Sequence, residues 1–274
     1  MSPTTSATLL ERDLGTVRAR VSYLDGCVTV GADPWIPCAS LVAPDGVLAD
    51  LLDEDRTQRW VQDLPVAASV FFQGQATRVL GVGVGLWLIA GTVPDVALDA
   101  TAITLQFELP ARLGFTRVAR AGLLGAPAVD VELVDDAAVL EWFVDRAFTH
   151  HLDPLADAIT ARVPIGRRLL WGNAAAALAN AGHSVEAASP PEQRAQIAAA
   201  TDRFVAAMPH DLAGLGHRFT PTVGAGLGGG ASSFWERDAC CLWFREDPHG
   251  AVCDSCSLLT VDDRRARLTA AAAR

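Results

Sequence analysis

Hydrophobic and polar residues alternate over several short segments in the first half of the chain. Apolar residues occupy every second position over residues 103–109, which predicts a half-buried strand, and residues 129–133 repeat the pattern. Residues 115–120 predict a third strand between them, so we expect one antiparallel sheet. A shorter alternation predicts a separate strand over residues 17–23.

Helical spacing of apolar residues dominates after residue 136 and also occurs earlier. Pro65 suits the first turn of one early helix, and Gly182 is a usual residue at the C-terminal end of a later one. Residues 189–192 form a capping box, which predicts the start of another helix. The expected helices cover residues 44–60, 65–80, 137–148 and 167–181, with further helices that begin at residues 153 and 191.

The order of these elements predicts an α+β fold, because strand signals come first and helical signals follow. A glycine-rich stretch over residues 224–230 then precedes a cysteine-rich segment near the C-terminal end. We therefore expect a helix-rich domain with a small antiparallel sheet over residues 1–230. A small metal-binding module should follow over residues 231–274.

Composition narrows the range of functions. Half of the 274 residues are hydrophobic and a fifth are charged, as in folded globular proteins. The formal net charge of −10 argues against binding to nucleic acid or to an anionic membrane surface. Residues 1–5 lack the basic and apolar regions of a signal peptide, and the uncharged run over residues 79–94 contains four glycines and is too short to span a bilayer. We expect a cytoplasmic protein, in which thiols stay reduced.

Four of the six cysteines fall close together in the sequence. Cys240 and Cys241 are adjacent, and Cys253 and Cys256 are separated by two residues. Adjacent cysteines cannot close a normal disulfide, whereas a C-x-x-C turn aims two sulfurs at one metal. Thiolates are the ligands that zinc and iron–sulfur clusters prefer. The spacing predicts a four-thiolate metal site and leaves zinc and iron–sulfur both open.

The remaining motifs favour structural interpretations. Residues 224–229 match G-x-G-x-x-G, but no helix signal follows them, so a linker is expected rather than a dinucleotide site. Cys27 and Cys38 are expected to be small buried residues rather than further ligands. His249, between the two cysteine pairs, is expected in a turn, and residues 150–151 in a solvated helix start.

Three sequence features together resemble the FhuF-type ferric siderophore reductases. The first is the vicinal cysteine pair followed, after eleven residues, by C-x-x-C, a spacing slightly longer than in the family. The second is the R-x-x-W-G-N pattern of residues 168–173, and the third is the aromatic-aromatic-arginine sequence of residues 243–245.

The resemblance implies a [2Fe–2S] cluster held by Cys240, Cys241, Cys253 and Cys256. It also implies one-electron, outer-sphere reduction of a ferric hydroxamate siderophore, with release of Fe(II). Because no nucleotide fingerprint is evident, a ferredoxin or a flavin reductase is expected to supply the electron. Peripheral association with a membrane stays open.

Aromatic and guanidinium groups near the cysteines are candidates for contact with a siderophore. An asparagine inside an alanine-rich helix, however, more often bridges structure than binds a ligand. Two other functions remain as alternatives, namely a zinc-stabilised binding module and an iron–sulfur redox sensor without reductase activity. The candidate substrate-binding residues are Trp171, Asn173, Arg237, Trp243 and Arg245.

Overall fold

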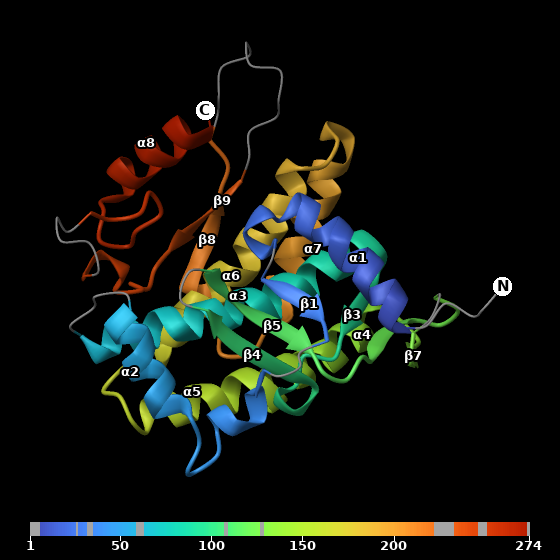
Figure 1. Cartoon of the computed structure of the whole chain (residues 1–274). Coiled ribbons are helices and arrows are strands. Elements are labelled where there is room, and N and C mark those ends of the chain that lie inside the picture. The colour runs from blue at the N-terminus through green and yellow to red at the C-terminus, as the bar shows by residue number, and fades with distance from the viewer. Residues whose placement is uncertain are drawn as a thin grey trace.

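Two long helices form the centre of the protein. The computed structural model describes residues 6–25, 27–31, 35–58, 63–106, 109–126, 129–221, 233–245 and 251–272. Helices α3 (Leu64–Ala90) and α6 (Arg167–Ala187) pack along each other, and both are buried over most of their length (Figure 1). The other α-helices are α1 (Ser6–Arg20), α2 (Leu48–Gln58), α4 (Asp136–Val144), α5 (Asp153–Thr160), α7 (Pro191–Ala207) and α8 (Val261–Ala272).

Three small sheets surround this helical core. The first has the strand order β1-β5-β4-β2, the second β3-β6-β7, and the third pairs β8 with β9. The expected α+β fold class is confirmed. The strands are β1 (Val28–Val30), β2 (Ile36–Pro37), β3 (Thr92–Pro94), β4 (Thr101–Gln106), β5 (Leu109–Phe115), β6 (Arg120–Leu123), β7 (Val131–Leu133), β8 (Gly216–Phe219) and β9 (Phe234–Arg237).

The expectation of one antiparallel sheet from three segments is wrong. Strand β4 pairs antiparallel with β5, with Ile103 opposite Leu113, whereas β7 pairs parallel with β6 in a different sheet. Alternation shows which face of a strand is buried but does not identify its partner. Strand β5 itself carries Pro110 and Gly114, which weaken the strand signal in the sequence.

The strand expected over residues 17–23 is also wrong, because most of this segment belongs to α1 and the following short 3₁₀ helix (Ser22–Leu24). Leu10, Leu14 and Val17 recur at helical spacing, and all three are fully buried. Val17 and Val21 lie on this buried face, and Arg18 and Arg20 between them lie nearer to solvent, so a short stretch of the helix alternates like a strand. A longer window favours the helix.

Several helices extend beyond their expected ends. Helix α3 continues ten residues past Leu80 because its glycines face close neighbours, and a Cβ on Gly83 would overlap the Phe143 ring. Gly91, with a φ of +65°, ends the helix in the left-handed region. Helix α6 likewise continues through Gly182, where Thr201 of α7 packs too closely for a side chain.

Two further expectations about helix starts need correction. The hydroxyl of Ser189 donates to the carbonyl of Val185 at 2.7 Å, so it ends α6 and does not cap α7. Helix α2 begins at Leu48 rather than residue 44, because a turn precedes it. Residues 59–62, which include the expected end of that helix, lie outside the described residues.

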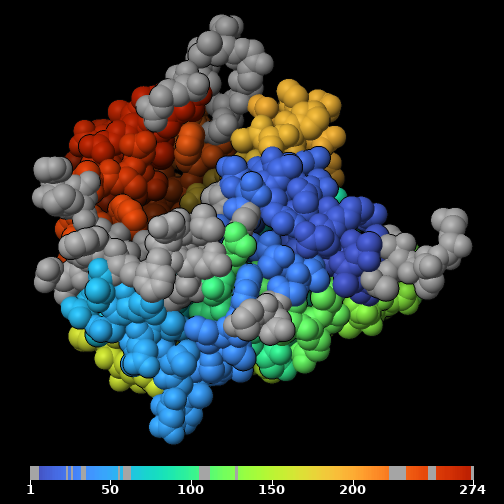
Figure 2. All heavy atoms as spheres, viewed as in Figure 1, coloured from blue at the N-terminus to red at the C-terminus, as the bar shows by residue number. Residues whose placement is uncertain are grey.

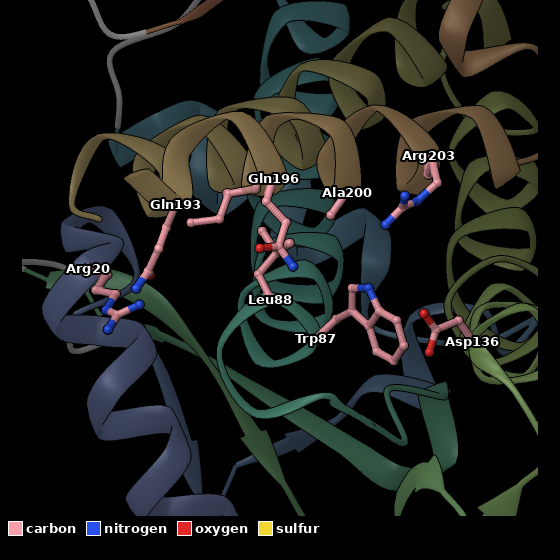
Figure 3. Close-up of a pocket in the computed structure, with 9 residues that line it drawn as sticks. Arg20, Trp87, Leu88, Asp136, Gln193, Gln196, Ala200 and Arg203 are labelled. Atoms are coloured by element: carbon pink, nitrogen blue, oxygen red, sulfur yellow. The ribbon is translucent and has the colours of Figure 1, made fainter. Parts of the chain in front are cut away.

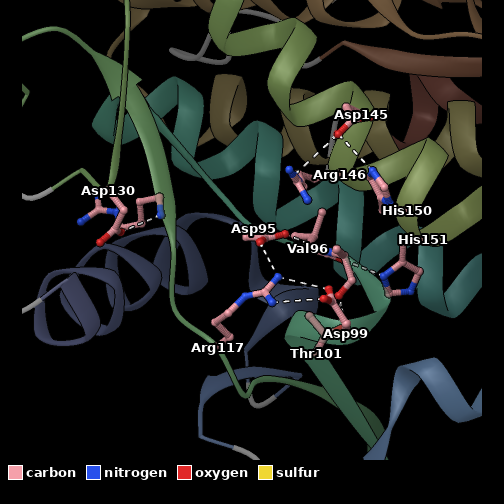
Figure 4. A network of polar contacts seen from close by, with 12 residues as sticks. Asp95, Val96, Asp99, Thr101, Arg117, Asp130, Asp145, Arg146, His150 and His151 are labelled. Atoms are coloured by element: carbon pink, nitrogen blue, oxygen red, sulfur yellow. Dashed lines mark hydrogen bonds and ion pairs between the residues drawn. The ribbon is translucent and has the colours of Figure 1, made fainter.

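A π-helical segment (Asp145–Leu152) joins α4 to α5. His150 is half exposed beside Asp145, as expected for a solvated position. His151 is fully buried, contrary to expectation, and its Nδ1 lies 2.6 Å from the carbonyl oxygen of Val96 (Figure 4). Burial lowers the pKa of His151 to about 4 despite that hydrogen bond. Nothing in the sequence signals the π turn that places adjacent histidines in such different surroundings.

The C-terminal segment is joined to the helical core by a strand pair. Strand β8 precedes the expected domain boundary and β9 follows it, with Gly216 opposite Arg237 and Phe219 opposite Phe234. The boundary at residue 230, the glycine-rich stretch and the G-x-G-x-x-G motif all lie outside the described residues. Figure 1 shows β8, β9 and α8 together on one side of the molecule, with β7 on the other side.

One buried ion pair fastens α1 to the second sheet. The Arg120 guanidinium, 2 % exposed, donates to Asp13 Oδ2 and to Thr92 Oγ1, both at 2.7 Å.

Replacing Asp13 with alanine leaves a buried cation unpaired, so we expect the free energy of unfolding to fall by about 3–5 kcal/mol. Urea unfolding measures the loss. Arg12, which bonds the other Asp13 oxygen from an exposed position, is the control, and Arg12→Ala should cost no more than about 1 kcal/mol.

The buried His151 also predicts a pH dependence of stability. Because the folded protein holds this ring neutral, the unfolded chain binds the additional proton below about pH 6.5. Stability should therefore fall as pH decreases from about 6.5 towards 4, and His151→Asn should reduce that slope by up to about 1.4 kcal/mol per pH unit. Urea unfolding at several pH values compares the two proteins. Parallel pH profiles would contradict the assignment.

Candidate functional site

The four C-terminal cysteines lie in two loops that follow the third sheet in the sequence. Cys240 and Cys241 come three and four residues after the end of β9, and Cys253 and Cys256 lie in the turn that leads to α8. The amide of Cys256 donates to the carbonyl of Cys253 at 3.0 Å, which closes this turn. Cys241 and Cys256 are buried, Cys240 is partly buried and Cys253 is exposed, and all four are free thiols. In the space-filling view, the C-terminal segment (red) lies at the upper left, with α2 (light blue) below it (Figure 2).

The second loop lies close enough to the first for Cys253 and Cys241 to interact electrostatically. Although Cys253 is exposed at the surface, desolvation of its thiol by neighbouring protein groups raises its pKa, and Cys241 and Cys256 raise it further. A hydrogen bond with Ser255 and the positive charge of Arg237 oppose this rise. Within the described part of the chain, however, no three histidine, cysteine or acidic side chains are placed as ligands of one metal ion. The structure therefore brings the pairs together without closing a metal site.

A buried chain of hydrogen bonds anchors the first loop to the central helices. The Ser69 hydroxyl of α3 donates to the carbonyl of Cys241 at 2.6 Å. The Asn173 amide of α6 donates to the Ser69 hydroxyl at 3.0 Å and to the Ser69 carbonyl at 3.1 Å. The Asn173 carbonyl oxygen accepts from Arg237 of β9. Ser69 and Asn173 are fully buried, and Arg237 is 5 % exposed, so these bonds form away from water.

This arrangement explains each residue of the Trp-Gly-Asn pattern on α6. Trp171 is buried in an aromatic cluster, stacked on His210 at a centroid distance of 4.2 Å and edge-on to Phe72 at 5.6 Å. A Cβ on Gly172 would overlap Ala239, so the glycine lets the residue before the cysteine pair rest on the helix. Asn173 holds Ser69, which in turn binds the loop.

Apolar contacts and an exposed ion pair complete the first loop. Leu242, with a φ of +64°, packs against Val66 and Val70 of α3. Its amide donates to Cys240 Sγ at 3.4 Å, the type of N–H to sulfur bond that second-shell groups make in thiolate sites. At the surface, Arg245 lies 2.6 Å from Asp63 at the start of α3. The loop conformation is thus fixed by α3 and α6 and by its own backbone.

A buried carboxylate holds α8 against β9. Glu236 is fully buried and accepts from Arg264 and Arg265 of α8, each at 3.1 Å, while His217 of β8 lies 2.7 Å away. Burial opposes ionisation of this carboxyl, yet the two arginines hold its pKa below the ordinary value. Arg264 also donates to the carbonyl of Arg237 at 2.9 Å. These contacts place the helix that follows the second cysteine pair.

The five candidate substrate residues fall into two groups. Trp171, Asn173 and Arg237 are buried and contact other protein groups, so little of these side chains is open to a ligand. The expected bridging character of Asn173 is confirmed. Trp243 is 43 % exposed, and the Arg245 side chain is also exposed, so both can meet a ligand beside the cysteine pair.

The sequence pattern did not identify two residues that position the cysteine loops. Ser69 lies 172 positions before Cys241, and its only signal is a hydroxyl within an otherwise apolar stretch of α3. Glu236 looks like any strand residue. His249 lies outside the described residues. The expected burial of Cys27 and Cys38 is confirmed, and burial raises the pKa of Cys38 to about 12.

A separate hollow of about 390 Å³ lies at the other end of α3. Arginines flank it, and Trp87 and Leu88 of α3 face residues of α7 across it (Figure 3). Trp87 is 18 residues beyond Ser69 on the same helix, a separation of about 27 Å. A ligand in this hollow would not touch the thiols. No described helix is both long and apolar enough to cross a membrane.

Comparison with known proteins assigns the family. A protein-family model described as "Ferric iron reductase FhuF-like transporter" matches residues 69–221, while no curated protein matches the sequence. The matched segment begins at Ser69, contains the Trp-Gly-Asn residues 171–173 and ends before the cysteines, so the ligand assignment stays a prediction. The match covers more than half of the chain, and the protein therefore belongs to the ferric iron reductase FhuF-like family.

Proposed function

We propose that this protein is a ferric siderophore reductase that reduces Fe(III)-hydroxamate complexes with a [2Fe–2S] cluster bound by Cys240, Cys241, Cys253 and Cys256. Family membership supports a function related to ferric iron reduction. The observation that supports the finer proposal is the electrostatic interaction of Cys253 in the second loop with Cys241 in the first, which Ser69 and Asn173 anchor to the helices that the family model matches.

The residues present fit an anionic thiolate-bound cluster. All four donors are soft sulfur ligands, and one of them already accepts a backbone N–H bond. Arg237, whose charge acts on Cys253 electrostatically, is buried, and its Nε has no hydrogen-bond partner among the described residues. Because a buried cation needs a counter-charge, this arrangement favours a negatively charged occupant. It does not by itself distinguish iron–sulfur from zinc.

The chemistry needs one electron and no proton at the iron complex. Hydroxamate oxygens are hard ligands that hold Fe(III) far more tightly than Fe(II), so adding one electron to Fe(III) weakens the complex and releases Fe(II). When bound, a [2Fe–2S] cluster supplies electrons one at a time, which matches this change. Ser69 and Asn173 keep the Cys241 loop in place, and the apolar contacts of Leu242 exclude water from one side of it.

We propose that the siderophore approaches the exposed side of the cysteine pair. Trp243 presents an aromatic face there, and Arg245 presents a guanidinium that Asp63 orients. Both groups suit a large polar complex. Trp171, Asn173 and Arg237, which are buried, position the cysteine loops in this proposal and do not bind substrate.

The electron is proposed to come from a ferredoxin or a flavin reductase in the cytoplasm. The glycines at 81, 83 and 85 lie inside α3, where two of them face neighbouring side chains too closely for a Cβ, so they do not form a nucleotide loop. The resemblance of the cysteine pattern to the FhuF-type reductases supports a protein donor.

Ligand substitutions test the cluster. Replacing Cys240, Cys241, Cys253 or Cys256 with serine should remove most of the visible absorbance and the bound iron and sulfide, because each thiolate holds the cluster directly. Anaerobic reconstitution followed by iron and sulfide analysis measures this loss. Cys27→Ala and Cys38→Ala, which alter buried thiols elsewhere, should retain the wild-type content. A substitution among the first four that keeps full absorbance would remove that residue from the ligand set.

Reduction of a siderophore tests the function. Reduced protein mixed anaerobically with a ferric hydroxamate and a ferrous trap should form one trapped Fe(II) for each electron lost by the protein. A colourless protein with stoichiometric zinc would instead establish the zinc-stabilised module. A coloured protein whose reduced form does not react with ferric hydroxamates would establish the redox sensor.

A further inference from the structure

We propose that Arg237 sets the reduction potential of the centre held by the cysteines, by placing an uncompensated positive charge beside it. This inference rests on the proposed function, because it concerns the cluster that the reductase would carry. Arg237 lies at the end of β9, three residues before Cys240, and its side chain is 5 % exposed.

Arg237 differs from the other deeply buried arginines in its partners. Arg120 pairs with Asp13 at 2.7 Å, and Arg264 pairs with Glu236 at 3.1 Å. Among the described residues, Arg237 has no carboxylate partner. Its Nη2 donates to the neutral amide of Asn173, and its Nε has no hydrogen-bond partner in the same part of the chain.

The uncompensated charge lies near the cysteine loops. Arg237 lies within electrostatic reach of Cys253, and through Asn173 and Ser69 it belongs to the chain of hydrogen bonds that ends at Cys241. Burying a guanidinium without a counter-charge is unfavourable, because the charge loses its hydration. The fold tolerates that cost here because a thiolate-bound centre supplies the missing negative charge.

A buried cation has a direct effect on a redox centre. Reduction adds one electron, and therefore one negative charge, to a centre that is already anionic, so a nearby guanidinium stabilises the reduced state more than the oxidised state. Because the guanidinium is buried, water screens this interaction less than it would at the surface. Arg237 thus favours transfer of one electron from the donor protein to the cluster, and it limits the driving force for the next transfer to Fe(III).

The neutral side chain of Asn173 contributes to this effect of Arg237. Its carbonyl oxygen orients the guanidinium, yet an amide leaves the positive charge intact. An aspartate at the same position would still accept a hydrogen bond from Arg237 and would offset its charge, but it would lose the amide donor to Ser69.

The experiment is a redox titration of the reconstituted full chain, followed by electron paramagnetic resonance, with iron and sulfide analysis of every sample. We expect Arg237→Gln to favour the oxidised state at least tenfold, a fall in midpoint potential of about 59 mV for a one-electron couple. Arg237→Lys, which keeps the charge, should change the equilibrium less than half as much on a logarithmic scale. The matched control is Arg245→Gln, which removes an exposed, ion-paired charge beside the same loop and should shift the potential little.

Every outcome of this titration is informative. A cluster-bearing Arg237→Gln protein with the wild-type potential overturns the inference. If Arg237→Gln does not hold a cluster, Asn173→Asp decides, because a fall in its potential supports the inference and an unchanged potential overturns it. If neither Arg237→Gln nor Asn173→Asp holds a cluster, Arg237→Lys decides. Retention of the cluster by Arg237→Lys supports a role for the charge, and loss of the cluster overturns that role. Wild-type protein without iron and sulfide refutes the proposed function itself, which separates the two failures.

Discussion

The buried hydrogen bond from Ser69 to the Cys241 carbonyl is the contact on which the arrangement of the site depends. It joins the second turn of α3, the longest of the described helices, to the loop that carries the vicinal cysteines, and Asn173 holds the donor in place from the facing helix. Because the bond forms away from water, losing either partner would leave a polar group buried and unsatisfied. The loop therefore takes its position from α3 and α6.

Glycines on α3 and α6 let other elements pack closely against this helix pair. A Cβ would not fit at Gly83 against Phe143 of α4, or at Gly172 against Ala239. The contact at Gly172 lets the cysteine loop rest on α6. Glu236 performs the corresponding role for the second loop, because it fixes α8 against β9.

The sequence predicted the α+β class, the existence of most helices and the burial of Cys27 and Cys38, because these depend on local periodicity and residue type. It failed where tertiary contacts decide. Gly182 looked like a helix end but serves the contact with Thr201, and Ser189 looked like a cap but bonds backwards to Val185. The importance of Ser69 depends on a partner 172 positions away, which no local pattern reveals. The Trp-Gly-Asn residues were recognised from resemblance, and their separate tasks became clear only from the contacts of each.

The antiparallel pairing of β8 with β9 has a consequence for how the protein is made. Synthesis proceeds from the N-terminus, so α3, α6 and β8 leave the ribosome before β9 and all four of the C-terminal cysteines. The surface that receives the cysteine loops can then fold while the thiols are still inside the ribosomal tunnel. Strand β9 then pairs with β8, and the thiols emerge next to the helices that their loop contacts. The cysteine loops are thereby the last part of the site to form, after the hydrophobic core.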